Sequence, residues 1–272
     1  MDDTGTRWRQ IDITYPGDGR DREQHACTHL ARILPAAEAA GTITAWWFIR
    51  KGPWRIRYQL PNPTRNDPVR DLLADGMKWT SDIYEPETHA FGGPDSMTTA
   101  HTLFHGDSRH LIDCISGDAP DRRERSLSLL ITLMRAAGLD WTEQGDVWAQ
   151  VAEQRAPLLS EPPDPTTWAE FTSGVRQLLL GTAHPGALPD GWLAAFQEAG
   201  AELRQIRERG DLTRGIRAVT ALHVIHHWNR IGLPATGQGV LAQAAKEAVF
   251  SAARRPEGDR KSALSVNQCR CQ

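Results

Sequence analysis

The sequence predicts an α+β protein, in which an N-terminal antiparallel sheet precedes a mainly helical C-terminal half. The first 93 residues contain short runs of β-forming residues bounded by glycine and proline. Lys51-Gly52-Pro53 separates two of these runs and is short enough for a hairpin, which makes the pair antiparallel. From residue 94 onward, apolar residues recur at helical spacing instead. We therefore expect a sheet-bearing part over residues 1–93, a helical part over residues 94–253 packed on it as one structural unit, and a disordered tail over residues 254–272.

The sheet-bearing part opens with a strand, because Trp8, Ile11 and Ile13 stand among alternating β-forming residues. The next segment spaces its apolar residues like a helix and ends at Gly41, a residue type that often terminates helices. The predicted elements are strand 7–15, helix 21–40, strands 43–50 and 54–60, helix 66–76 and an extended segment 77–91. This βαββαβ order is ferredoxin-like, with helices on one face of the sheet.

The second half of the chain has the apolar spacing of successive helices. Asp95 is placed to cap the first of them. A proline-rich stretch from Leu158 to Pro165 reads as a linker or surface loop. The predicted helices are 95–115, 121–137, 142–155, 168–180, 191–209, 212–231 and 238–253.

The bulk composition excludes several classes of protein. With 40% hydrophobic and 24% charged residues, the 272-residue chain has the composition of a globular protein. A net charge of −3 argues against a nucleic-acid partner. No apolar run approaches the length of a membrane span, and the N-terminus lacks the layout of a signal peptide, so a cytoplasmic location without membrane association is expected. Cys27 and Cys114 fit buried thiols, and the Cys269-x-Cys271 pair in the tail is weak evidence for a metal or redox site.

Arginines and glutamates of the predicted strands are the first candidate site. Residues i and i+2 of a strand share a face, so Arg55 and Arg57 point the same way, with Ile56 opposite. A guanidinium suits a carboxylate because it donates two parallel hydrogen bonds. By the same rule Glu85 and Glu87 share a face. They either balance the arginines in a structural salt-bridge network, or orient an arginine or join in proton transfer.

A stripe of histidines is the second candidate. His223, His226, His227 and Arg230 lie at i, i+3, i+4 and i+7, which is one face of a helix. Three imidazoles could hold zinc, but the H-E-x-x-H pattern is absent and we expect no metal and no other cofactor. One histidine acting as a base or acid, or histidines hydrogen-bonded in the core, are the alternatives. His101 and His105, with Arg109 beyond them, are expected to line the same cleft.

These segments also resemble a known family, the C-terminal elimination domain of class I lantibiotic dehydratases. The resemblance covers about residues 7–253. Trp46 to Arg50 matches the family's W-F-F-I-R-Y opening, and Trp54 to Arg57 matches its H-L-R-L-R-like strand. Tyr84 to Gly93 matches its Y-E-x-E-x-x-R-Y-G-G motif, and His223 to Leu233 matches its late histidine-bearing helix. The large glutamylation domain of full-length dehydratases is missing, so the chain looks like the split form of thiopeptide-type bacteriocin pathways.

The resemblance implies glutamate elimination from glutamylated Ser or Thr of a ribosomally made precursor peptide, which leaves dehydroalanine or dehydrobutyrine. Arg55 and Arg57 would hold the glutamate carboxylates, Glu87 would be the family's functional glutamate, and one of the three late histidines would move a proton. Substrate contacts are further expected from Arg50, Arg55, Tyr84, Glu85 and Arg109. The implied partners are the precursor peptide, leader plus core, and a glutamyl-transferring dehydratase protein; a homodimer is compatible with the sequence.

One departure from the family pattern keeps two other functions open. Ala90 stands where the family has an arginine, so Arg50 or Arg109 would have to supply that cation, or the reaction has changed. A related branch fuses two dehydroalanines into a pyridine ring by formal [4+2] cycloaddition without the elimination residues. The third hypothesis is a non-catalytic module that docks a leader peptide or partner on a sheet edge.

Overall fold

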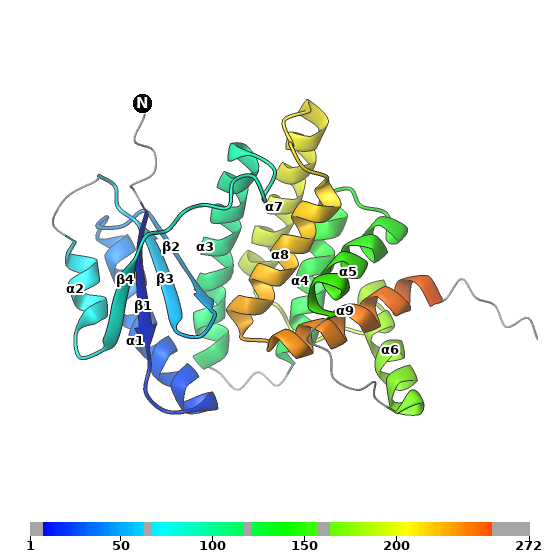
Figure 1. Ribbon diagram of the computed structural model, residues 1–272, viewed down its shortest axis with the longest axis horizontal. Coiled ribbons are helices and arrows are strands. Elements are labelled where there is room, and N and C mark those ends of the chain that lie inside the picture. The colour runs from blue at the N-terminus through cyan, green and yellow to red at the C-terminus, as the bar shows by residue number, and fades with distance from the viewer. Residues whose placement is uncertain (1–7, 63–66, 117–120, 157–163, 252–272) are drawn as a thin grey trace, which may run out of the picture.

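The computed structural model describes residues 8–62, 67–116, 121–156 and 164–251, and over these residues it is a mixed α+β fold (Figure 1). The sheet, with α1 and α2, forms one side of the molecule, and a set of helices forms the other. The predicted tail over residues 254–272 and most of the predicted linker lie outside the described residues. None of the helices that the structure describes is both long and apolar enough to cross a membrane.

The sheet is antiparallel throughout, as the sequence predicts. Its strands lie in the order β2-β3-β1-β4, and Ile56 in the middle of the sheet pairs with Ile11 on one side and with Phe48 on the other. Along the chain the elements follow as β-α-β-β-α-β. They are β1 (Trp8–Thr14), α1 (Gly19–Ala39), β2 (Ala45–Arg50), β3 (Trp54–Gln59), α2 (Pro68–Ala74) and β4 (Lys78–Asp82).

The two faces of the sheet differ in character. β3 alternates strictly, with Trp54, Ile56 and Tyr58 buried on one face and Arg55 and Arg57 half-buried on the other. Helix α1 covers the apolar face, where its Glu38 accepts a hydrogen bond from the Trp46 indole and its Glu23 pairs with Arg50. The alternation predicted for Arg55 and Arg57 is therefore confirmed.

The fourth extended segment is shorter than the sequence suggests. β4 ends at Asp82, and residues 83–93 leave the sheet as an irregular stretch that crosses to the helical half (Figure 1). Pro86 has no N–H for a strand ladder, and the residues after it fold into a turn in which Phe91 N donates to Glu87 O. The strand rule therefore does not apply to Glu85 and Glu87, and the prediction that they share a face of a strand is wrong.

Helix α3 (Pro94–Ser116) closes one edge of the sheet. The N–H of Phe48 donates to Ser108 Oγ at 3.3 Å, and His105 Nδ1 lies 3.2 Å from the backbone nitrogen of Trp46. These side chains satisfy outward-facing backbone groups of β2, which an edge strand otherwise leaves unpaired. His105 thus binds the edge of the sheet and Glu38, rather than lining a cleft with the late histidines.

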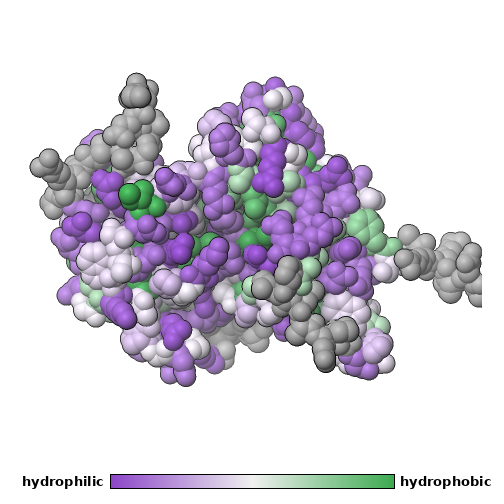
Figure 2. All heavy atoms as spheres, in the orientation of Figure 1, coloured by the Kyte–Doolittle hydropathy of each residue, from purple (hydrophilic) through white to green (hydrophobic). Residues whose placement is uncertain are grey.

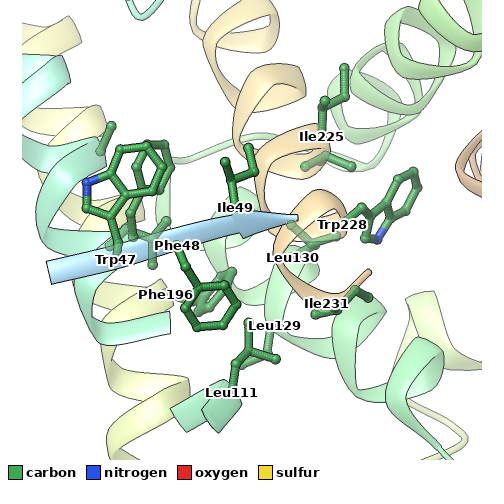
Figure 3. Close-up of a cluster of buried hydrophobic side chains, with 14 of the residues drawn as sticks. Trp47, Phe48, Ile49, Leu111, Leu129, Leu130, Phe196, Ile225, Trp228 and Ile231 are labelled. Atoms are coloured by element: carbon green, nitrogen blue, oxygen red, sulfur yellow. The ribbon is translucent and has the colours of Figure 1, made fainter. Parts of the chain in front are cut away.

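The remaining helices confirm the predicted helical half, with boundaries shifted by a few residues. They are α4 (Arg122–Ala136), α5 (Trp141–Arg155), α6 (Pro165–Leu180), α7 (Asp190–Arg209), α8 (Ile216–Ile231) and α9 (Ala235–Phe250). Helix α8 is buried along most of its length and packs against β2 (Figure 1). Figure 3 shows Ile49 of β2 near Ile225 of this helix, within a cluster of apolar side chains that also includes Trp228. The apolar core therefore runs without a break from the sheet into the helices.

A buried ionic cluster joins three of these helices. The carboxylate of Asp107 on α3 accepts hydrogen bonds from Arg230 Nε at 2.6 Å and from the Trp192 indole of α7 at 2.9 Å, and it lies 2.8 Å from His227 Nδ1. Burial alone raises the pKa of Asp107, but the charges and hydrogen bonds of His227 and Arg230 outweigh it and lower this pKa to about 2.

We predict that Asp107→Asn destabilises the fold by about 3–5 kcal/mol, because it leaves the fully buried charge of Arg230 without a counterion. The matched control is Asp146→Asn, which breaks an exposed ion pair with Arg217 and should cost about 1 kcal/mol or less. Urea unfolding at neutral pH measures both, and equal losses would contradict the prediction.

Comparison of the parent protein with Asp107→Asn at different pH values tests the pKa of Asp107. A carboxylate with a depressed native pKa adds stability above its unfolded pKa of about 4, and that stability is lost as the pH falls toward about 2. The difference in unfolding free energy between the parent and Asp107→Asn should therefore be constant from pH 7 to pH 5 and shrink below about pH 4.

Candidate functional site

Arg57 lies at the centre of the candidate site, on the face of the sheet that α1 does not cover. Its guanidinium carbon is 4.4 Å from the ring centre of Trp47 and 4.1 Å from that of Tyr84. Its Nε donates to the side-chain oxygen of Gln10 on β1 at 2.6 Å. Burial lowers the pKa of Arg57 to about 10, so the side chain stays charged at neutral pH. The two rings and the amide fix the plane of this cation.

Arg55 shares this face but has its own counterion. Its Nε is 3.6 Å from Asp12 on β1, the residue that pairs with it across the sheet. Its side chain is 36% exposed, so it borders solvent. The positive charge of Arg55 is thus largely balanced, whereas Arg57 has only neutral groups in direct contact among the described residues.

A row of aromatic rings connects Arg57 with helix α8. Trp47 and Phe104 have ring centres 4.9 Å apart, and the ring of His226 stacks on Phe104 with centres 5.1 Å apart and nearly parallel planes. Phe91 meets His226 edge-on at 5.2 Å. The imidazole is therefore held in one orientation by apolar contacts on two sides.

Glu87 lies near both His226 and Arg57. One of its carboxylate oxygens is 3.9 Å from His226 Nε2, and the charge of Glu87 also acts on Arg57. The side chain of Glu87 is 55% exposed and that of His226 is 11% exposed, so a solvent path reaches the imidazole at this point. Burial, and then the charge of Arg230, holds the pKa of His226 well below its usual range. His226 is therefore neutral near pH 7 and able to accept a proton.

The other two late histidines lie deeper. His223 is fully buried against Phe91 and Phe104, and burial lowers its pKa to about 3. His227 is buried beside Arg230 and binds Asp107 instead. The helical stripe is real, but among the three histidines the structure brings only His226 next to Glu87.

The Gly92-Gly93 turn anchors the crossing segment on the start of α8. Gly92 has φ +84°, and a Cβ atom there would lie 2.9 Å from Leu212 and 3.1 Å from Val219. Its carbonyl accepts a hydrogen bond from the Thr213 N–H, and the Arg214 side chain donates to the carbonyl of Ala90 at 2.8 Å. A guanidinium from the α7–α8 connection thus binds the backbone of Ala90, the residue that stands where the resemblance places an arginine.

Several predicted substrate contacts lie elsewhere. Arg50 is on the opposite face of the sheet, where it binds Glu23 and the carbonyl of Ile231. Arg109 is on the outer side of α3 and pairs with Glu38. Glu85 is exposed, whereas Tyr84 is buried under Arg57 and bonds His101 at 2.8 Å. Neither Arg50 nor Arg109 can act as the cation missing at Ala90, because strand alternation and helix phase direct both away from Arg57.

Sequence reasoning missed the aromatic and polar residues that position these groups. Gln10 and Trp47 face Arg57 only because the strand register pairs each with it. Phe104 and Arg214 come from other parts of the chain, and no local pattern assigns them to the site. Among the described residues no group of three or more His, Cys, Asp or Glu side chains is placed to hold a metal ion.

Polar residues cover most of one face of the molecule (Figure 2). Figure 2 shows apolar surface between the sheet-bearing part and the helical part, on a face that is otherwise mostly polar.

Comparison with known proteins identifies the family of this chain. The model of the family described as lantibiotic biosynthesis dehydratase C-term matches residues 8–249. No curated protein matches the sequence. The crystal structure of the tRNA-dependent lantibiotic dehydratase MibB from Microbispora sp. 107891 superposes with a TM-score of 0.62 at 16% identity, over 93% of this chain and 29% of MibB.

Two smaller structures are similar over nearly their whole length. TsrL has a TM-score of 0.60 at 14% identity, over 92% of this chain and 99% of TsrL. TbtD, the pyridine synthase from thiomuracin biosynthesis, has a TM-score of 0.56 at 15% identity, over 90% of this chain and 98% of TbtD. At these identities the likeness establishes a common fold, and the family assignment rests on the match over residues 8–249. The chain belongs to the family of lantibiotic biosynthesis dehydratase C-terminal domains.

Proposed function

We propose that this protein eliminates glutamate from glutamylated Ser or Thr residues of a ribosomally made precursor peptide. The observation that supports this most is the arrangement of Arg57, Glu87 and His226 around one aromatic row. A neutral imidazole and a guanidinium whose direct contacts are neutral lie on the same side of the sheet. β-Elimination next to a carbonyl needs a base for the α-proton and positive charge for the oxygens that gain electrons. The site offers both.

In the proposed reaction His226 takes the proton from the α-carbon of the esterified residue. The electrons of that C–H bond form the α,β double bond, the bond from the β-carbon to the ester oxygen breaks, and glutamate leaves as a carboxylate. Arg57 stabilises the enolate oxygen or the leaving carboxylate, and Glu87 accepts a hydrogen bond from the protonated imidazole. Arg214, held at the carbonyl of Ala90, supplies the cation that the family arginine would provide.

A second candidate function is pyridine formation by [4+2] cycloaddition of two dehydroalanines. Two observations favour it: Ala90 replaces the family arginine, and the chain matches 98% of the pyridine synthase TbtD. This reaction expels no glutamate, so it needs less positive charge at the site. A docking module without catalysis is the third outcome that an experiment must distinguish.

Incubation with a synthetic peptide that carries a glutamyl-serine ester tests the three functions. We expect release of free glutamate and a peptide that has lost the corresponding mass, measured by mass spectrometry. Ring closure of a bis-dehydroalanine peptide with an inert ester would identify the cyclase instead. Binding of both peptides without turnover would leave only the docking function.

Arg57 should matter for turnover, whereas Arg109 should not. Arg57→Ala is expected to lower kcat by about 100-fold or more, because one cation stabilising developing negative charge contributes about that much. Arg57→Lys should recover little, since a lysine lacks the planar group that Trp47 and Tyr84 clamp. Arg109→Ala is the matched control and should retain the parent rate, because its side chain pairs with Glu38 on α1. Equal losses in the two alanine variants would contradict the site.

His226→Ala should lower kcat by a factor of about 100 to 10,000, the usual contribution of a general base. Because burial holds the pKa of His226 well below its usual range, the parent protein should show a constant kcat from pH 6 to pH 8. A rate that falls with a midpoint near the ordinary histidine pKa of about 6.5 would instead assign the base to an exposed group. His89→Ala, in the same crossing segment but exposed, is the control and should leave the rate unchanged.

A further inference from the structure

A polar recess lies away from the Arg57 site. It has a volume of about 540 Å³ and is bordered by the start of α1, the β2–β3 hairpin, the end of α5 and the connection between α8 and α9. Its charged lining is Arg22, Glu23, Arg50, Lys51 and Arg155. The recess thus holds an excess of three positive charges in a chain whose net charge is −3.

The single carboxylate of the lining is already engaged. Glu23 binds Arg50 and also Arg122, so one negative charge faces two guanidiniums. Arg50 is fixed further by the carbonyl of Ile231 and lies directly against the α-carbon of Gly232, where a Cβ atom would be 2.3 Å from its guanidinium carbon. The floor of the recess is therefore rigid and positively charged.

Two other cations of the lining, Arg22 and Arg155, have neutral hydrogen-bond partners. Arg22 donates to the carbonyl of Gly17 at 2.7 Å. Arg155 Nε donates to the amide oxygen of Gln238 at 3.0 Å, and Gln238 in turn donates to Asn229. These contacts orient the guanidiniums without neutralising them. Burial lowers the pKa of Arg155.

Two helix N-termini add to the positive electrostatic potential of the recess. α1 begins at Gly19 and α9 begins at Ala235, and both residues line the recess. Neither helix receives a side-chain hydrogen bond from its N-cap residue, Asp18 or Pro234. First-turn N–H groups and helix dipoles favour anions at such positions.

We propose that this recess binds carboxylate groups of an acidic segment of the peptide substrate, outside the segment that reacts. The proposal rests on the proposed function only in taking the substrate to be a peptide. The cations come from three separate elements, α1, the β2–β3 hairpin and α5, around a volume larger than one small anion fills. This arrangement suits several carboxylates along a chain better than a single phosphate. The β2–β3 hairpin connects the recess with the Arg57 site, since Arg50 and Lys51 line the recess and Arg57 lies on β3 of the same hairpin.

Fluorescence anisotropy with a fluorescein-labelled hexaglutamate peptide tests the proposal on the full chain. We expect saturable binding that weakens with salt. Arg22→Gln with Arg155→Gln should weaken it by about tenfold or more, because two charge-assisted contacts are lost. Arg204→Gln with Arg217→Gln removes the same charge from exposed arginines of α7 and α8 and should leave the affinity within about twofold.

The remaining outcomes separate the alternatives. Absence of saturable binding, or equal weakening in both double variants with native thermal unfolding curves, overturns the proposal. Displacement of the peptide by millimolar inorganic phosphate, but not by millimolar chloride, assigns the recess to a single phosphate and also overturns it. Turnover of a short glutamylated peptide without acidic residues should be the same in the Arg22→Gln, Arg155→Gln variant and the parent. Because the anisotropy measurement involves no chemistry, failure of elimination and failure of carboxylate binding are observed independently.

Discussion

The buried carboxylate of Asp107 is the interaction on which the arrangement of the molecule depends. It joins α3, which carries it, to Trp192 of α7 and to His227 and Arg230 of α8. A buried carboxylate destabilises the fold unless its oxygen lone pairs accept hydrogen bonds. Here α7 and α8 supply the donors to Asp107. The position of α8 along α3 is therefore fixed by hydrogen bonds with defined geometry, in addition to apolar packing that tolerates sliding.

This constraint reaches the candidate site through Phe104, which is one turn before Asp107 on α3. The guanidinium of Arg230 lies 4.4 Å from the centre of the Phe104 ring, and His226 stacks on the same ring. Since α3 also binds the edge of β2 through His105 and Ser108, one helix sets the distance between the sheet that carries Arg57 and the helix that carries His226. The charge of Arg230 further disfavours protonation of His226. A single buried cluster thus determines both where the imidazole lies and which protonation state it has.

Much of the fold follows from local sequence patterns, whereas the site follows from them only in part. Periodicity and turn residues encode local and nearest-neighbour features. These include the strands with their antiparallel pairing, the seven helices that the structure describes from residue 94 onward, and the common direction of Arg55 and Arg57. Which late histidine meets Glu87 depends on the rotation of α8, and all three lie on one stripe, so spacing could not separate them. Arg50 was assigned to the substrate because it stands in a family motif, but alternation along β2 puts it on the other face. Arg214 could not be found at all, since it meets Ala90 only through tertiary contact between two loops.

The two edges of the sheet differ in a way that limits assembly. The β2 edge is sealed by α3, whereas all five residues of β4 at the opposite edge are exposed. A sheet with one open edge can pair with one further strand. When two copies pair through these edges, neither copy keeps an open edge. Growth by edge-to-edge contact would stop at a pair, and a single bound extended chain would block that pair from forming.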